Sequence, residues 1–249
     1  MVATPRFAST VILYRLKENF EANQCNFEVL LIQRSKEMKF LGGVHAFPGG
    51  KLEDEDYSED SIARCRGINK LQAHRIIQDT KTYHQNQNIS LGFWIAGIRE
   101  VFEEIGILFA HNKDLSLIDL SEPEIQKRFK VYRKKLLKNQ IHFYEIMERE
   151  DLYYAVDKLF YFRHFITPEV SSIRYDTRFF IAKLPPTQNI MSFSNEIIAL
   201  EWASPSETLT RYRRKEIILI PPQYSCFLTL RRIKDIEAFC DTSLNCQTS

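Results

Sequence analysis

Short apolar runs alternate with polar connections and helical patterns along the chain. The first two runs, residues 11–16 and 27–33, are almost continuously apolar, which is typical of strands buried on both faces. Later runs predict further strands: one ending at Thr167-Pro168, then residues 174–184, 197–202 and 217–220. Strands interleaved with helices predict an α/β fold, in which a mixed sheet lies between helices.

The intervals between the runs carry helical patterns. In residues 122–138, apolar side chains recur at helical spacing and predict a stripe facing the core: Ile125, Phe129, Tyr132 and Leu136. The other faces of this segment are basic, which is typical of a solvated surface; recruitment of an anionic substrate is the alternative. Further helices are predicted over residues 58–81, about 90–106, 204–214 and 221 to about 239.

The most distinctive helical segment is residues 98–107, Ile-Arg-Glu-Val-Phe-Glu-Glu-Ile-Gly-Ile. At about 100° per residue, Glu100, Glu103 and Glu104 share one sector, and apolar side chains take the opposite face. Carboxylates at these spacings repel one another, so a surface helix gains nothing from them. Mg²⁺ and Mn²⁺ prefer carboxylate oxygens, so the trio predicts a metal site. A solvated acidic face is the alternative.

The residues around this segment support a helix that ends at a ligand site. Gly106 is placed to end the helix, and Ser90 is placed to begin it. Ala96 and Gly97 precede the acids by one turn and would leave room for a ligand. Upstream, the pair Gly49-Gly50 is either a simple turn or a place where backbone approaches a ligand closely.

Composition narrows the class of protein. The hydrophobic share of 44% allows a sizeable core. The net charge of +2 is too small for a domain that binds duplex nucleic acid, which would be far more basic. No apolar run is long enough to span a bilayer, and the first residues lack a secretion-signal pattern. Five cysteines without a C-x-x-C pair suit reduced thiols rather than a zinc site. We therefore expect a cytoplasmic protein that binds neither nucleic acid nor membrane.

Seven residues together resemble the Nudix box, G-x5-E-x7-R-E-U-x-E-E-x-G-U, where U is aliphatic: Gly50, Asp56, Arg99, Glu100, Glu103, Glu104 and Gly106. Residues 99–107 match the second half of the pattern throughout. Asp56 stands where the family has Glu, and 42 residues rather than 7 separate it from Arg99.

An interrupted box is known in the coenzyme A diphosphatase-like branch of the Nudix hydrolases. Residues 30–50 are similar to that branch's pattern L-L-T-x-R-S-x3-R-x3-G-x3-F-P-G-G, with Ile32 for its Thr and Lys39 for its second Arg. The segments 166–168 and 174–180 also resemble this branch. The resemblance implies one Nudix domain over 1–249, with an insertion at about 57–98 and a helical excursion at about 112–160.

The resemblance also implies chemistry: hydrolysis of a diphosphate bond in a nucleoside diphosphate conjugate, dependent on Mg²⁺ or Mn²⁺. The ions would be bound by Glu100, Glu103, Glu104 and a carbonyl oxygen of Gly49 or Gly50, and Arg99 would orient the acids. Glu100 or Glu103 would accept the proton of the attacking water. Asp176 and Glu196 are alternative bases.

The favoured substrate is coenzyme A or an acyl derivative, giving 3′,5′-ADP and 4′-phosphopantetheine or its acyl form. Arg34 and Lys39 would bind its 3′-phosphate, beside the glycine pair Gly49-Gly50. The sequence leaves open a small-molecule nucleotide substrate of another kind, such as ADP-ribose or a dinucleotide. A Nudix-like binding module without catalysis is a further alternative, and a homodimer is one option for the assembly.

Overall fold

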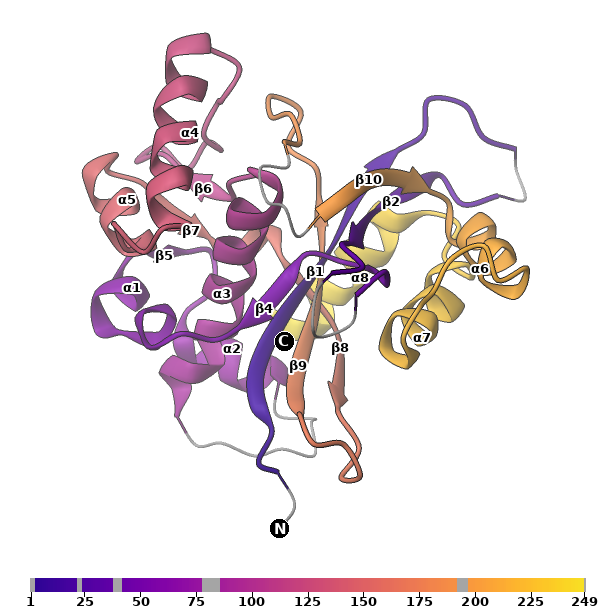
Figure 1. The fold of residues 1–249 in the computed structure, drawn as a ribbon. Coiled ribbons are helices and arrows are strands. Elements are labelled where there is room, and N and C mark those ends of the chain that lie inside the picture. Colours follow the sequence, from indigo (N-terminus) through magenta and orange to yellow (C-terminus); the bar gives the residue numbers. More distant parts are fainter. Residues whose placement is uncertain (1–2, 22–23, 38–41, 78–85, 192–196, 249) are drawn as a thin grey trace.

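The computed structural model describes residues 3–21, 24–37, 42–77, 86–191 and 197–248 (Figure 1). Its larger sheet has seven strands in the order β10-β2-β1-β9-β8, with β3 paired to β2 and β4 paired to β1. The strands are β1 (Arg6–Leu16), β2 (Phe27–Arg34), β3 (His45–Ala46), β4 (Gly49–Lys51), β8 (Phe160–Ile166), β9 (Tyr175–Lys183) and β10 (Ile197–Ala203). β1 and β9 run parallel, and the other neighbours in this sheet are antiparallel.

Helices cover both faces of the larger sheet (Figure 1). One face packs against α3 (Gln87–Ile105), and the opposite face packs against α6 (Pro205–Arg213), α7 (Pro221–Leu230) and α8 (Ile236–Thr248). Along β1, Val11 points to the α3 side, whereas Ile12 points to the side of α7. The continuous apolar runs are therefore strands buried on both faces, and the predicted mixed sheet between helices is confirmed.

A smaller unit lies beside α3. It holds a three-stranded sheet of β5 (Cys65–Arg66), β7 (Tyr153–Ala155) and β6 (Ala110–His111), with helices α1 (Glu59–Ala63), α2 (Lys70–Ile77), α4 (Pro123–Leu136) and α5 (Phe143–Arg149). The predicted stripe of α4 faces the core: Phe129 and Leu136 are buried, and Phe129 meets Phe102 of α3 edge to face. Phe102 also stacks on Phe143 of α5. The unit thus packs along α3, with α2 at its start and with α4 and α5 against the end that carries the acids.

Three predicted elements differ from the structure. The helix expected over 58–81 is divided into α1, β5 and α2, because Gly67 turns the chain with φ +103° where a side chain would collide with Asp157. The strand expected over 217–220 is absent from the described chain; the carbonyl of Ile218 there accepts one bond from the His45 amide. The last helix is two helices, because the Asp235 carboxylate accepts from the amides of Glu237 and Ala238 and so begins α8.

The start of α3 also differs from the prediction. Asn86 caps the helix, since its side chain accepts hydrogen bonds from the amides of Asn88 and Ile89. Ser90 lies inside the first turn, buried against His74. Gly97 does not leave room for a ligand: a Cβ there would lie 3.0 Å from Oγ of Ser9 on β1. The small residue lets the helix lie close to the sheet.

No helix in the described part of the chain combines the length and the apolar character needed to cross a membrane.

Candidate functional site

The three glutamates lie at the C-terminal end of α3. Gly106 ends the helix as predicted, in the left-handed conformation with φ +77°, and its amide donates to the carbonyl of Phe102. The side chain of Glu100 is 13% exposed and that of Glu103 is 22% exposed, so both reach solvent at the edge of the core. The trio therefore lies where a small charged ligand can approach.

A buried ion pair joins the helix to the loop before it. Arg99 donates from Nε to Oδ1 of Asp56 at 3.0 Å and from Nη2 to Oδ2 at 2.9 Å. The two side chains are 5% and 0% exposed. Asp56 belongs to a 3₁₀ turn, η1 (Asp54–Tyr57), and its carboxylate also accepts from the Glu53 amide. This turn brings the aspartate close enough to replace the longer glutamate of the family pattern.

The same arginine holds two of the acids. Its Nη1 lies 2.9 Å from Oε1 of Glu100 and 3.2 Å from Oε1 of Glu103. Its Nη2 also donates to the carbonyl of Lys51, at the end of β4. Arg99 therefore fixes both carboxylates relative to the strand that carries the glycine pair.

The glycine pair makes close contact with the other side of the acids. An ideal Cβ on Gly50 would lie 2.3 Å from Oε1 of Glu100, so a side chain at this position would displace that carboxylate from its place beside Arg99. A Cβ on Gly49 would lie 2.3 Å from the carbonyl oxygen of Ser9. The Gly49 amide donates to Oε2 of Glu104 at 3.2 Å. The loop backbone is thus in direct contact with the turn of α3 that carries Glu100, Glu103 and Glu104, which is called the acid turn below.

Burial and mutual repulsion make the acids hard to ionise together without a cation. Burial raises the pKa of Glu100 to about 7, with Glu103 and Asp56 adding to the effect and Arg99 opposing it. Burial raises the pKa of Glu104 well above its usual range, and the neighbouring Glu100 adds to this. The pKa of Glu103 is also raised by burial. A bound divalent cation would remove this penalty.

The acids do not form a closed metal cage. Within the described ranges, no group of three or more His, Cys, Asp or Glu side chains is arranged to hold a metal ion. Glu100 and Glu103 turn an oxygen toward Arg99, and Glu104 turns one toward Gly49. Mg²⁺ is commonly held by one or two carboxylates and keeps waters or substrate phosphates as its other ligands. The all-oxygen donor set fits that mode of binding.

The other predicted residues are placed differently. Arg34, at the end of β2, lies near enough for its charge to lower the pKa of Glu104 against the larger effect of burial. Asp176 is 1% exposed, and its carboxylate pairs with His164 and Arg178. Lys39 and Glu196 lie outside the described residues.

Sequence reasoning missed Arg133, which is 2% exposed and donates to the carbonyl of Glu103 at 2.9 Å. The signal was present in the sequence. Arg133 follows Phe129 by four residues and precedes Leu136 by three, so it belongs to the core-facing side of α4. A basic residue on an apolar stripe warrants a search for its partner.

Replacing Asp56 with alanine should lower the free energy of unfolding by about 3 kcal/mol, because it leaves the buried charge of Arg99 without its bidentate partner. Urea denaturation followed by circular dichroism measures this. The matched control is Glu237→Ala, which removes the exposed ion pair with Lys183 and should change stability by less than about 1 kcal/mol. Equal effects of the two variants would contradict the bracing role of Asp56.

A family profile described as the NUDT19 Nudix domain matches residues 5–233. The acyl-coenzyme A diphosphatase NUDT19 of Xenopus laevis is 27% identical over 229 residues, which cover 83% of this chain and 60% of that protein. The Homo sapiens protein of the same name is 26% identical over 242 residues, covering 88% of this chain and 64% of that protein.

The chain thus spans less than two thirds of the length of these relatives. Among solved structures, a NUDIX hydrolase from Alicyclobacillus acidocaldarius has a TM-score of 0.71 at 22% identity, and the match covers 96% of each chain. At this identity the likeness supports the fold.

Proposed function

The chain belongs to the NUDT19 Nudix domain family, and from this premise we propose that it is a metal-dependent hydrolase of the diphosphate bond in coenzyme A or an acyl-coenzyme A. The family membership confirms the resemblance drawn from the box residues. The observation that carries the proposal is the contact between two halves of the interrupted box: Arg99 pairs with Asp56, 43 residues away, and Gly50 lies against Glu100.

The side chains of this turn divide the work of such a reaction. Glu100, Glu103 and Glu104, with a carbonyl oxygen of Gly49 or Gly50, would hold Mg²⁺ or Mn²⁺. Bound divalent ions neutralise phosphate oxygens and lower the pKa of a bound water. Arg99 orients Glu100 and Glu103 through its ion pairs. The products from coenzyme A are 3′,5′-ADP and 4′-phosphopantetheine, with the oxygen of water added to one phosphate.

The proton of the attacking water would pass to Glu100 or Glu103. Both carboxylates belong to the acid turn and are partly exposed. Asp176 has less support as the base, because its carboxylate already pairs with His164 and Arg178. Glu196 remains an alternative for which the described residues give no geometry.

The favoured substrate draws support from the relatives, whose names state an acyl-coenzyme A diphosphatase activity. Family members act on small nucleotide conjugates, and the 3′-phosphate separates coenzyme A from most of the others. We assign Arg34, which the structure describes, to the binding of that phosphate. Lys39, which lies outside the described residues, is assigned to the same role. A cytoplasmic location, the absence of nucleic-acid and membrane partners, a homodimer and the single-domain organisation remain predictions.

A substrate panel tests the proposal. The protein is incubated with coenzyme A, an acyl-coenzyme A, ADP-ribose, NADH and diadenosine polyphosphates in Mg²⁺ or Mn²⁺, and the products are identified by mass spectrometry. We expect 3′,5′-ADP from the coenzyme A compounds, and no product from Glu103→Gln prepared identically. Turnover confined to ADP-ribose or a dinucleotide would show that this compound, rather than coenzyme A, is the substrate. Nucleotide binding without hydrolysis would indicate a binding module.

Arg34→Ala should raise KM for coenzyme A by about 10-fold or more, since an ionic hydrogen bond is worth about 1.5–3 kcal/mol. KM for dephospho-coenzyme A, which lacks the 3′-phosphate, should change by less than about 2-fold. Steady-state kinetics with both substrates measure the difference, and the exposed neighbour Lys36→Ala serves as the control. An equal rise in KM for both substrates would show that Arg34 does not recognise the 3′-phosphate.

A further inference from the structure

Arg133 reaches from α4 to the end of the helix that carries the acids. Its Nε donates to the carbonyl oxygen of Glu103 at 2.9 Å. In a helix that ends at Ile105, this carbonyl is among the last four, which have no partner within the helix. A cation at that position also interacts favourably with the helix dipole. Arg133 therefore stabilises the main chain of the acid turn from outside the helix.

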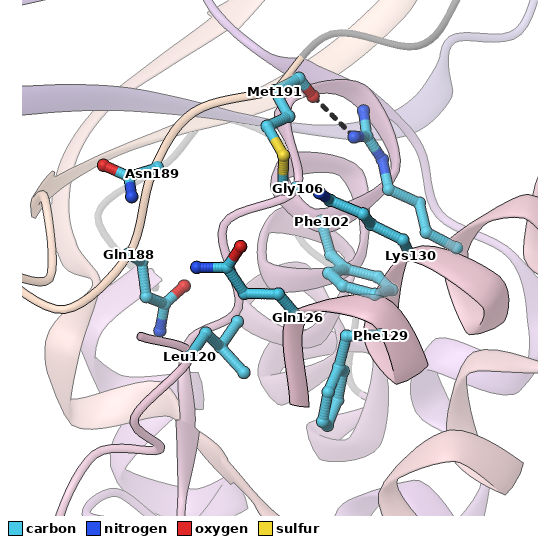
Figure 2. A pocket seen from close by; sticks show the side chains of 10 residues that line it. Phe102, Gly106, Leu120, Gln126, Phe129, Lys130, Gln188, Asn189 and Met191 are labelled. Atoms are coloured by element: carbon cyan, nitrogen blue, oxygen red, sulfur yellow. Dashed lines mark hydrogen bonds between the residues drawn. The ribbon is translucent and has the colours of Figure 1, made fainter. Parts of the chain in front are cut away.

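The same guanidinium holds a second segment. Its Nη1 donates to the carbonyl of Met191, drawn as the dashed line in Figure 2. Figure 2 also shows Gln188, Asn189 and Met191 along one side of a small pocket, with Phe102 and Phe129 on the other side. Arg133 thus joins the acid turn to the segment 188–191 at the wall of this pocket.

Independent bonds fix that segment to the same place. The Met191 amide donates to the carbonyl of Ile105, another of the last helix carbonyls. The Gln188 side chain accepts from the Leu108 amide at 2.8 Å and donates to the Leu108 carbonyl at 2.9 Å. The end of α3 is therefore tied to residues 188–191 through main-chain atoms, with Arg133 bonded to both.

The last glycine of the box makes space for this arrangement. An ideal Cβ on Gly106 would lie 3.0 Å from Nη1 of Arg133. Gly106 thus serves two purposes: its left-handed conformation ends the helix, and its missing side chain admits the guanidinium. A side chain at this position would therefore crowd Arg133 in addition to straining the backbone.

We propose that Arg133 is a positioning residue for the metal-binding glutamates, acting through the main chain of Glu103 and the segment that ends at Met191. The inference rests on the function proposed above. Burial lowers the pKa of Arg133 to about 10, and the negative charges of Glu104 and Glu103 oppose that shift. The guanidinium therefore stays protonated at neutral pH, close to two of the acids. Losing a group that orients metal ligands typically costs about 10–100-fold in metal affinity or activity.

The test compares Arg133→Met with Arg133→Lys in the full chain. Mn²⁺ binding is measured by electron paramagnetic resonance of the free ion, beside kcat, KM and the melting temperature. For Arg133→Met we expect Mn²⁺ affinity and kcat to fall by about 10–100-fold, with KM within about 3-fold of the original value. Arg133→Lys should recover part of both losses, because an ammonium keeps the charge but lacks the planar fork of donors that bonds two carbonyls.

The control is Leu136→Ala, which truncates a buried residue of the same helix and destabilises the protein while leaving the hydrogen-bonding groups of Arg133 in place. Near-original Mn²⁺ affinity and kcat in Arg133→Met would overturn the proposal. So would Leu136→Ala reproducing both losses, or Arg133→Lys matching the original protein. If Arg133→Met does not fold, Arg133→Lys is compared with Leu136→Ala. The proposal then stands only if Arg133→Lys loses Mn²⁺ affinity and kcat and Leu136→Ala does not. An original protein that binds Mn²⁺ but hydrolyses nothing would contradict the proposed function alone, since the binding comparison still judges Arg133.

Discussion

In Glu104→Gln, kcat should fall by at least about 100-fold, while the free energy of unfolding in a chelator should stay equal or rise. The amide keeps an oxygen that can accept from the Gly49 amide, so the contact with the loop survives. The substitution removes a carboxyl group that is costly to ionise in this place, because burial and the repulsion of Glu100 both raise the pKa of Glu104. The Glu104 carboxyl would thus lower the stability of the metal-free protein, and its role would be to bind a cation.

The measurements are steady-state kinetics with a coenzyme A compound and urea denaturation in EDTA. Glu124→Gln, an exposed glutamate in the first turn of α4, is the matched control and should leave both quantities unchanged. Full activity in Glu104→Gln would remove this residue from the metal site. A large loss of stability would show that Glu104 is structural, and the interpretation of the acid turn would have to change.

The acid turn could be predicted from sequence because its information is local. Helical periodicity alone places Glu100, Glu103 and Glu104 on one sector, and Gly106 marks the end of the helix. The contact of Arg99 with Asp56 is different, since 43 residues separate them and no periodicity links them. The family pattern places both residues in one box, and the structure shows that they form a bidentate ion pair.

Other features depended on tertiary contacts that a sequence pattern does not contain. Gly97 was interpreted as space for a ligand, but Ser9 of β1 occupies the space beside it. The break at Gly67 depends on the packing of Asp157, which is distant in sequence. Arg133 was grouped with neither the acids nor the surface charges, because its partners, the carbonyls of Glu103 and Met191, are main-chain atoms. The place of Arg133 on the apolar stripe of α4 indicates that it is buried, but main-chain partners cannot be identified from residue types.

Removing divalent ions with EDTA should abolish turnover and also change how stability depends on pH. In the metal-free protein, burial raises the pKa of Glu100 to about 7 from an ordinary value of 4.5. Between these values the folded state binds the proton more tightly than the unfolded state, so the free energy of unfolding falls as pH rises through this window. Mn²⁺ binds the deprotonated carboxylates, so the stabilisation it provides should grow over the same range.

The measurement is the melting temperature with Mn²⁺ and with EDTA at about pH 5.5 and about pH 8, at matched ionic strength because salt screens exposed charges. An ion present at about 100 times its dissociation constant stabilises the folded protein by about 2.7 kcal/mol. The melting temperatures in Mn²⁺ and in EDTA should therefore differ clearly at the higher pH and only slightly at the lower one. Glu100→Gln should make the metal-free protein less sensitive to pH in this window. Undiminished turnover in EDTA would contradict the metal site directly. A Mn²⁺ effect of the same size at both pH values would instead place the ion away from Glu100, because binding at that carboxylate has to displace its proton.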